Sequence, residues 1–574
     1  MEFRLTSAAL ILVVATYLFL GAMGVTDHGT PQPKDSAYNQ LAQGLMGGHL
    51  YAAREVPAEL ARLKDPFDPA ATVVLREDPR FRLQDFSYAG GRLYLYFGVA
   101  PALLVFIPWH LLTGGWLYHW AAVAFLCSVG VLVNLSLVSA IRRRTMPDGP
   151  PWIGAACALI LGLGSYAPLL LARADMWEVP IAFGALCVFV ALRCLWEEYA
   201  DPARPAKWIA LASAAIGVGF AARPTILPSA AILLFPFVSG EVRRNWRAWC
   251  GAVIPLGLCG AAVAAYNALR FGSPFEFGQN FQLAGVNVAS LHLFSASYFW
   301  TNLRFYLFQP IQWTSVFPFA HEPPIGPLRA HLPLNHGGAE HMSGALLYSP
   351  ILWAAIAVPF AIRVARSDRS LVMAAASAAW VALSSFTLLC FFFGACSRYQ
   401  FEFVPEMALL ACLGVIAMEA ALRGAARVAA RCAWIPAFLV SCTVPVLYGI
   451  DRCASDHNSR GVYFLVFGNI PAAENEFATA RILSPGNPLS RLGSDLILIS
   501  ERRFGEAQVA LASLVRDFPD YAKARYVLGN LDLKGGRMDE AVANLSAAHR
   551  LEPEDGAITA ALDAAVARAR KAAN

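Results

Sequence analysis

Repeated apolar runs, each about as long as a bilayer is thick, constrain the fold of this chain more than any other feature. A helix needs about 20 mostly apolar residues to cross the hydrocarbon core of a membrane. Because lipid offers no partners to backbone amides, such runs must become helices. The expected spans are 5–24, 95–114, 117–141, 152–173, 179–197, 207–222, 225–239, 249–268, 344–363, 371–394, 404–421 and 433–451. The sequence therefore predicts an all-α, polytopic transmembrane helical bundle with about 11–13 spans.

The composition agrees with a membrane protein and argues against a nucleic-acid-binding protein. Only 15% of the residues are charged and 57% are hydrophobic, whereas about 25% of the residues in a soluble domain are charged. The net charge of +5 is small, and the basic residues cluster beside the spans, where topology explains them. We therefore expect membrane lipid, and no nucleic acid, among the partners.

Arginine clusters orient the spans, because cytoplasmic loops are enriched in Lys and Arg. Such clusters begin at Arg142, Arg243, Arg363 and Arg423, and we expect them on the cytoplasmic side. The ranges 25–94 and 269–343 then form outer loops of a core that covers 1–451, and everything after residue 450 lies outside. The expected location is a bacterial inner membrane, with the C-terminal part in the periplasm.

One pair of predicted spans is too close in sequence to form two ordinary crossings. Only two residues separate 95–114 from 117–141. If both crossed, the basic triplet that follows them would lie on the outer side. One of the two is therefore expected to be broken or re-entrant, which a cavity lined by protein tolerates.

After residue 451 the charge rises, the apolar runs stop and a 34-residue repeat begins. Equivalent positions recur at this spacing: Ala473, Ala507 and Ala541; Phe477, Leu511 and Leu545; Pro485, Pro519 and Pro553. Residues 528–553 match the tetratricopeptide pattern, except that Asp532 stands where Tyr is usual. We expect two repeats and a partial one that keeps mostly its second helix, packed as helical hairpins over 452–574. A soluble cap and a binding unit for a protein partner both stay open.

Three acidic clusters are expected at the outer mouth of the bundle. Asp35 heads an amphipathic helix over 35–51, which follows the first span and should lie in the interface plane. Asp175 and Glu178 fall in a very short outer loop, and Glu402 falls at the outer start of a late span. Charges this close to a bilayer are expensive, so they indicate functional sites.

Each acid also has a structural explanation. Asp35 can N-cap its helix. The acids at 175–178 can cap the next span or bind Arg173, and Glu402 can bind Arg398. The sequence leaves these explanations open beside a direct role in chemistry.

Arginines are expected on the same face. Arg223, Arg270, Arg92 and Arg398 all fall at outer ends of spans. The guanidinium fork binds phosphate with two parallel hydrogen bonds, which suits a lipid headgroup. Interfacial snorkelling explains the same placement. The loop 269–343 is rich in aromatic residues, as an interface-lying segment or a platform for a lipid or sugar would be.

Three runs of residues carry a family resemblance. They are Asp35-x-x-Tyr-x-x-Leu-Ala-x-x-Leu-x-x-Gly-x-Leu-Tyr after the first span, Tyr94-Leu-Tyr-Phe-Gly, and Arg398-Tyr followed by Glu402 and Pro405. Together they resemble the C-type membrane glycosyltransferases, which include the dolichyl-phosphate-mannose protein mannosyltransferases and the bacterial aminoarabinose transferases. The resemblance covers roughly 1–451. Some members of the superfamily carry tetratricopeptide repeats on the outer side.

The resemblance implies a polyprenyl-phosphate-linked sugar as donor and transfer on the outer face, usually with inversion. The first-loop acid of the family falls on Asp35, which is then the general base for the acceptor hydroxyl. The second-loop acids fall on Asp175 and Glu178. Together with Glu402 they are candidates to orient the acceptor or to hold a divalent cation. Members differ in metal use, so metal dependence stays open.

The resemblance also assigns roles to the arginines. Arg398 and Arg270, with Arg223 in reserve, are candidates to neutralise the departing lipid phosphate. Before the second span the chain departs from some relatives, because Arg92 and Tyr94-Leu-Tyr stand in place of Lys-Pro-Pro. Arg92 is therefore a further candidate contact of the lipid phosphate.

Two other classes of function compete with an enzyme. A non-catalytic scaffold would anchor the repeats in the membrane and present them to an envelope assembly complex. It needs no acids at the outer mouth, yet three clusters are expected there. A transporter should show internal symmetry and helix breaks near the membrane midplane, and the spans contain no convincing internal repeat.

Overall fold

The computed structural model describes residues 1–24, 32–77, 81–201, 205–321, 332–340, 342–364, 368–553 and 555–573. The chain folds into two compact units. The core unit comprises Met1–Trp313 and Ala320–Arg452, and the repeat unit comprises Thr314–Phe319 and Cys453–Asn574. The six residues Thr314–Phe319, which the sequence placed in an outer loop of the core, thus belong to the repeat unit.

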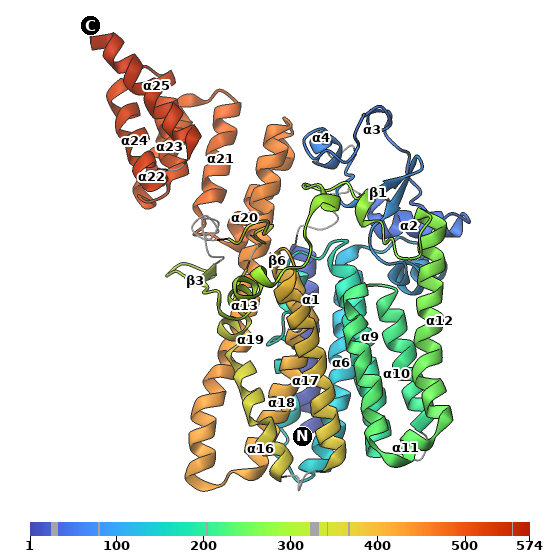
Figure 1. Ribbon diagram of the computed structural model, residues 1–574. Helices are drawn as coiled ribbons and strands as arrows, with labels where there is room; N and C mark the ends of the chain where they lie inside the picture. The colour runs from blue at the N-terminus through green and yellow to red at the C-terminus, as the bar shows by residue number, and fades with distance from the viewer. Residues whose placement is uncertain are drawn as a thin grey trace. The chain divides into compact units, whose positions relative to one another are not determined.

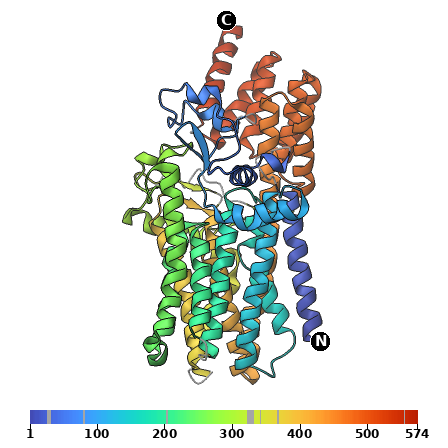
Figure 2. The same cartoon turned by 90° about the vertical axis from the view of Figure 1, so that its right-hand side faces the viewer.

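The core unit is a bundle of membrane-spanning helices, as predicted. Within the described ranges, seven helices are long and apolar enough to cross a membrane: α1 (Glu2–Met23), α6 (His119–Thr145), α9 (Glu178–Ala200), α12 (Trp246–Phe271), α17 (Arg369–Phe391), α18 (Val404–Ala421) and α19 (Gly424–Val466). Figures 1 and 2 show that the axes of α6, α9, α12 and α17 are roughly aligned with one another. The chain is an integral membrane protein.

Shorter elements occupy the remaining predicted spans: α7 (Ile153–Gly162), α8 (Ala167–Leu171), α10 (Pro205–Phe220), η4 (Pro224–Val238), η8 (Pro350–Ala357) and α16 (Val358–Val364). The element η4 is a 3₁₀-helix with two internal prolines. Its 15 residues rise about 2.0 Å each and so extend about 30 Å, the thickness of the hydrocarbon core. A 3₁₀-helix therefore crosses with fewer residues than an α-helix needs.

The predicted span 95–114 does not form. Its residues end the strand β2 (Arg92–Leu95) and then form a π-helix, η3 (Ala102–Phe106), and α5 (Ile107–Thr113). These 12 helical residues rise about 18 Å, well short of a crossing. Pro108 has no backbone N–H for the i→i−4 ladder, which accounts for the wider π turn before it. This is the break that the short connection to 117–141 predicted.

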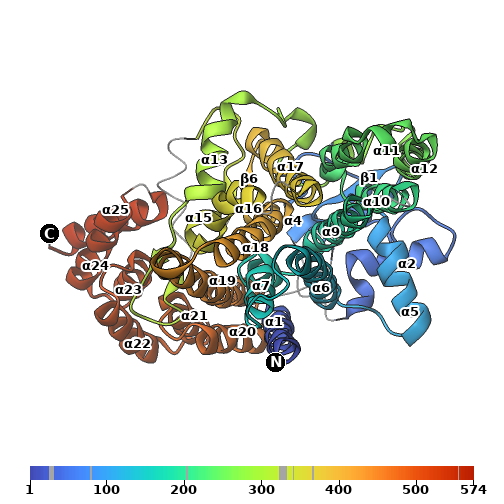
Figure 3. The ribbon, with the colours of Figure 1, turned by 90° about the horizontal axis from the view of Figure 1, so that it is seen from below.

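The first outer loop lies across the direction of the spans. Its elements are η2 (Pro33–Asp35), α2 (Ala37–Met46), α3 (Ala58–Ala61), α4 (Val73–Glu77), β1 (Phe86–Ala89) and β2, which pairs with β1 in antiparallel fashion. Figure 3 looks along the spans and shows α2 and α5 lengthwise, as interfacial helices lie. The apolar stripe of α2 is buried at Tyr38, Leu41 and Ala42. The helix is shorter than the predicted 35–51, because Gly47 and Gly48 end it.

The long outer loop is mostly irregular. It holds η5 (Gln279–Phe281), η6 (Val288–Ser290), η7 (Ala296–Tyr298), α13 (Phe299–Phe308), β3 (Gln312–Trp313), β4 (Ala320–His321) and β5 (Ala339–Glu340). β3 pairs with β4, and β5 pairs in parallel with β6 (Ala395–Cys396). The second pairing places the end of this loop beside the segment η9 (Ser397–Glu402). The short helices α11 (Gly240–Arg244) and α15 (Ala345–Tyr348) complete the core unit.

The repeat unit is built from helices (Figure 1) that fall into two series, and within each series the first residues of the helices recur every 34 residues. They are α20 (Ile470–Leu483), α21 (Pro488–Ser500), α22 (Phe504–Asp517), α23 (Ala522–Lys534), α24 (Met538–Leu551) and α25 (Gly556–Ala573). The predicted positions Ala473, Ala507 and Ala541 are fully buried, and so are their large apolar counterparts. The 34-residue pattern therefore marks the face on which the helices pack.

The prediction that the first repeat keeps mostly its second helix is wrong. The helix α19 runs on to Val466, and the position 34 residues before the start of α21 at Pro488 lies within it. The last part of α19 therefore serves as the first helix of the first repeat. The sequence concealed it, because this helix continues the predicted span 433–451 without a break in α19.

Asp495 breaks the pattern of the repeats. It stands where the first and third repeats have Gly461 and Gly529, and a Cβ atom on Gly529 would lie 2.7 Å from Leu545 Cγ. The Asp495 residue is 7% exposed, and within the described structure its Oδ2 atom has no hydrogen-bond partner. Burial raises the pKa of this carboxyl to about 6, while Arg491 acts in the opposite direction. The repeat unit therefore carries a carboxylate that destabilises it at neutral pH.

We expect Asp495→Asn to stabilise the repeat unit. Because the pKa of Asp495 is higher in the folded state, the free energy of unfolding falls as the pH rises through about 6. At pH 7.5 the variant should gain about 1–2 kcal/mol after allowance for solvent screening, and this part of the pH dependence should vanish. Amide hydrogen exchange of α21 and α22 in the full chain measures the gain. The exposed Asp563→Asn should change nothing, and faster exchange in Asp495→Asn would contradict the account.

Candidate functional site

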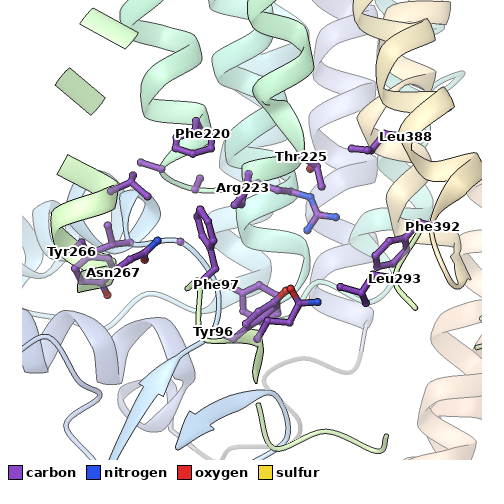
Figure 4. Close-up of a pocket in the computed structure, with 18 of the residues that line it drawn as sticks. Tyr96, Phe97, Phe220, Arg223, Thr225, Tyr266, Asn267, Leu293, Leu388 and Phe392 are labelled. Atoms are coloured by element: carbon purple, nitrogen blue, oxygen red, sulfur yellow. The ribbon is translucent and has the colours of Figure 1, made fainter. Parts of the chain in front are cut away.

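A cavity of about 280 Å³ opens among the ends of several core helices, on the side that the sequence predicts to face outward. Its walls come from 96–99, the 220–225 turn between α10 and η4, the last turns of α12, the long outer loop and the end of α17. Figure 4 shows the aromatic and aliphatic side chains around it, with Arg223 and Asn267 among them. An apolar cavity with a few convergent polar groups is the usual form of a small-molecule site.

Arg270 supplies a buried positive charge to this cavity. The residue is 8% exposed. Its Nη2 atom donates to Asn267 Oδ1 (2.7 Å) and its Nη1 atom donates to the Leu95 carbonyl oxygen (3.2 Å). The guanidinium lies 3.9 Å from the centre of the Tyr266 ring. Within the described part of the chain it forms no ion pair, and its buried Nε atom has no hydrogen-bond partner. The positive charge of the Arg270 guanidinium and its Nε–H donor are therefore available to an anionic ligand.

Arg223 also lines the cavity, but its charge is compensated. Its Nε atom donates to Glu402 Oε1 at 2.5 Å, and the two side chains are 13% and 7% exposed. The guanidinium lies 5.0 Å from the centre of the Tyr399 ring. A second, smaller cavity is lined by Arg223, Glu402 and the buried Glu406. The structure thus pairs Glu402 with Arg223 rather than with Arg398, across 179 residues.

The acids of the second outer loop hold the backbone of that loop. Glu178 Oε2 accepts from the Asp175 N–H (3.0 Å), and Asp175 Oδ1 accepts from the Met176 N–H (2.6 Å). Both residues are buried. Both carboxylates thus accept from backbone N–H groups of their own loop, whereas the N-cap of α9, Trp177, has no side-chain cap hydrogen bond. Neither acid lines the main cavity.

His119 joins the first and second outer loops. It is 1% exposed and lies at the start of α6. Its Nδ1 atom is 3.1 Å from Asp175 Oδ1, and its Nε2 atom accepts from the Tyr38 N–H at 3.4 Å. Tyr38 in turn donates from Oη to the carbonyl oxygen of Gly98, which lines the cavity (3.4 Å). His119 was not predicted as a site residue from the sequence, although a histidine at the start of a predicted span is a signal that indicates such a site.

Asp85 is a second junction between loops that was not predicted from the sequence. Its backbone is left-handed, with φ of 61°. Its carboxylate accepts from Trp177 Nε1 and from Gln282 Nε2, both at 2.7 Å. Asp85 therefore ties the first outer loop to the second outer loop and to the long loop. No local pattern in the sequence indicates these partners.

Arg398 belongs to a separate cluster around Glu340. Glu340 Oε1 lies 2.7 Å from Arg173 Nη1, and Glu340 Oε2 lies 3.1 Å from Arg398 Nη1. Burial alone would raise the pKa of Glu340, but Arg398, Arg173 and Arg452 together hold it well below its usual value. Arg398 is thus paired with a carboxylate and does not line the main cavity.

Asp35 lies at the end of the η2 turn, one residue before the N-cap of α2. That N-cap is Ser36, so the structure does not make Asp35 the cap of its helix. The Asp35 side chain is exposed, and its backbone carbonyl accepts from Gln40 Nε2 (2.8 Å). Burial and Arg82 lower the pKa of the nearby Arg54 to about 10, and Asp35 acts against them. Asp35 does not line the cavity.

The eight predicted site residues therefore divide into distinct groups. Arg223 and Arg270 line the main cavity, and Glu402 lines the smaller one. Arg92 is exposed and stacks over the ring of Tyr51, with 4.2 Å between the guanidinium carbon and the ring centre. The others lie in the loops described above. Among the residues that the structure describes, no group of three or more His, Cys, Asp or Glu side chains is arranged to hold a metal ion.

Comparison with known proteins supports the repeats directly. The family model of the tetratricopeptide repeat matches residues 498–566, which confirms the predicted repeats. A search of curated proteins returned no match.

Two solved structures are similar in outline. One is a crystal structure of ArnT from Cupriavidus metallidurans bound to undecaprenyl phosphate, at 14% identity and a TM-score of 0.39, over 90% of this chain and 80% of that one. The other is yeast Tom70, at 11% identity and a TM-score of 0.20, over 76% of this chain and 80% of that one. Neither similarity bears on the chemistry of the site. The chain is an all-α integral membrane protein with C-terminal tetratricopeptide repeats.

Proposed function

We propose that this chain is a membrane glycosyltransferase. It moves a sugar from a polyprenyl-phosphate donor to an acceptor hydroxyl at the outer face of the membrane. The observation that carries the proposal is the unpaired guanidinium of Arg270 in a cavity of about 280 Å³ with aromatic and aliphatic walls. A polyprenyl phosphate has the matching parts, since its chain is apolar and its headgroup is an anion.

The reaction assigned to this site needs a base and a stabilised leaving group. The acceptor oxygen attacks the anomeric carbon and loses its proton to a carboxylate, which we assign to Asp35. The bond between the anomeric carbon and the phosphate oxygen breaks, and its electron pair leaves with the polyprenyl phosphate. Arg270, supported by Arg223, stabilises the charge that develops on this oxygen.

The position of α2 supports the role of Asp35. Tyr38 lies three residues after Asp35 and donates a hydrogen bond to Gly98 in the cavity wall. The η2 turn is therefore tied to the same wall as the proposed phosphate site. The exposed side chain of Asp35 leaves its carboxylate accessible to an acceptor that arrives from outside.

The remaining acids have positioning roles in this proposal. Glu402 fixes the guanidinium of Arg223, and the pair Asp175 and Glu178 fixes the loop that holds His119. The sequence prediction that these three acids orient the acceptor or hold a divalent cation stays a prediction beside these positioning roles. The proposal assigns no step to a metal ion.

We place the protein in a bacterial inner membrane with its C-terminus in the periplasm. Figure 1 shows the N-terminus and α11 at one end of the core unit and α2 and β1 at the other. The basic residues gather at the first end, where Arg142 pairs with Glu2 and α11 carries Arg243 and Arg244. The positive-inside rule makes that end cytoplasmic.

A reporter enzyme that works only outside the cytoplasm, fused after Asn574, is expected to be active. The same reporter placed in the connection after Arg144 is expected to be inactive, because that connection lies at the basic end. Activity assays on whole cells measure both. A fusion after Asn574 that works only in the cytoplasm would contradict the placement of the cavity on the outer side.

Lipid binding tests the proposed donor class. Purified full-length protein is expected to bind a polyprenyl phosphate in native mass spectrometry and to bind the matching polyprenol, which lacks the phosphate, about 10-fold or more weakly. Equal binding of the two lipids would mean that the cavity recognises only the apolar chain. The proposal for Arg270 would then be wrong.

A further inference from the structure

The tip of the long outer loop folds as a tight turn. The strands β3 and β4 pair Gln312 with His321 and Trp313 with Ala320. Beyond them the Thr314 N–H donates to the Phe319 carbonyl oxygen (2.9 Å), and the Phe319 N–H donates to the Val316 carbonyl oxygen (2.8 Å). The residues between the strands, Thr314–Phe319, are the segment that belongs to the repeat unit.

Within the repeat unit this tip lies against Gly486, in the turn between α20 and α21. A Cβ atom on Gly486 would lie 1.9 Å from Val316 Cγ1 and 2.8 Å from Val316 Cβ. The backbone of Gly486 is not in the left-handed region, so its φ angle does not require glycine. Val is stiff at χ1, so Val316 cannot give way by a change of rotamer alone. The close approach of Val316 explains why this position has no side chain.

The equivalent turns of the other repeats support this explanation for the glycine at position 486. The prolines at the 34-residue spacing are each followed by a different residue: Pro485 by Gly486, Pro519 by Asp520 and Pro553 by Glu554. The turn after Asp517 accommodates an acid in the second repeat, so the turn itself does not require glycine. Only the first repeat, which faces Val316, lacks a side chain there.

We propose that the turn between α20 and α21 is a binding site for the apolar tip Thr314–Phe319 of the same chain. The repeat unit thereby holds the segment Thr314–Phe319, independently of whether the chain transfers sugars. The ligand that fits this site is a short apolar turn, and Val316, Phe317 and Phe319 supply its apolar side chains. Their exposures of 43%, 37% and 42% leave part of each side chain in contact with protein. The occupant of this turn is therefore a segment of the same chain rather than a separate protein partner.

Cysteine cross-linking tests the proposed contact in the full chain. Val316→Cys combined with Gly486→Cys is expected to form a disulfide when copper phenanthroline supplies the oxidant. A Cβ atom on Gly486 would lie 2.8 Å from Val316 Cβ, so a small outward shift of the tip gives the separation of about 3.5–4.5 Å that a disulfide needs. The reference pair is Val316→Cys with Gly556→Cys, an open position at the start of α25. Cys432, an exposed native thiol, is replaced by Ser in every variant.

The expected yield for the first pair is at least about 10-fold above the reference pair, within one chain. Equal yields would overturn the proposal. A disulfide that forms only between two chains would also overturn it, since the occupant of the turn would then be a second copy.

A second variant pair separates binding of the tip from folding of the repeats. Gly486→Asp installs the residue that the second repeat already has, while Asp520→Gly makes the reverse change where no tip is bound. Amide exchange of 314–319 should become at least about 10-fold faster in Gly486→Asp, because the new side chain overpacks against Val316. It should stay unchanged in Asp520→Gly, and exchange of α22 to α24 should stay unchanged in both. Unaltered exchange of the tip in a folded Gly486→Asp variant would contradict the proposed contact.

Discussion

Replacing Asp35 by Asn is expected to slow glycosyl transfer by at least about 100-fold, because the step loses its general base. The variant keeps the size of the side chain. It also keeps the N-cap of α2, since the cap is Ser36. We therefore expect normal insertion and accumulation, and unchanged binding of the donor lipid at Arg270.

Glu59→Gln is the matched control for this prediction. Glu59 is an exposed acid of the same outer loop that lies outside the cavity lining. Its replacement changes the charge of the loop by the same amount and should leave turnover within about twofold, as for other surface changes. Initial rates with purified proteins measure both. A well-expressed Asp35→Asn variant that transfers sugar at a near-normal rate would remove Asp35 from the mechanism.

Replacing Arg270 by Gln is expected to weaken binding of the lipid phosphate by about 10–100-fold, the free energy of one or two charge-assisted hydrogen bonds. Gln retains a donor for Asn267 or for the Leu95 carbonyl oxygen, so the last turn of α12 keeps its anchor. The loss should appear with polyprenyl phosphate and not with polyprenol. This contrast distinguishes a lost phosphate contact from a collapsed cavity.

Arg304→Gln is the control for the second prediction. Arg304 is an exposed arginine of α13 and does not line the cavity. Because it removes the same charge from the outer loops, it reports any general electrostatic attraction of the lipid. Equal weakening in Arg304→Gln and Arg270→Gln would show that surface charge, rather than the cavity, captures the phosphate.

The features that could be predicted from the sequence have local signatures. The buried face of the repeats follows from a fixed 34-residue spacing, and Ala473, Ala507 and Ala541 are all fully buried. The break near residue 100 follows from the two residues between neighbouring apolar runs. Apolar length indicates spans well, but it does not distinguish an α-helix from the 3₁₀-helix η4, because both bury the same side chains in lipid.

The features that could not be predicted depend on pairing over long distances in the sequence. Glu402 pairs with Arg223 rather than with its neighbour Arg398, and Glu340 pairs with Arg173 across 167 residues. Which arginine keeps an unpaired charge depends on these pairings. Arg270 is left without an ion pair among the described residues, and no property of its local sequence separates it from the others.

The measurement that tests the central claim most directly is release of polyprenyl phosphate from a defined donor. Purified full-length protein in lipid nanodiscs is incubated with a set of polyprenyl-phosphate-linked sugars and with an extract that supplies acceptor hydroxyls. The account predicts that at least one donor yields free polyprenyl phosphate together with a sugar–acceptor product, and that Asp35→Asn and Arg270→Gln each lower the initial rate of release by about 10-fold or more. Polyprenyl phosphate that binds but is never released from any donor would contradict an enzyme and would favour a scaffold that carries repeats.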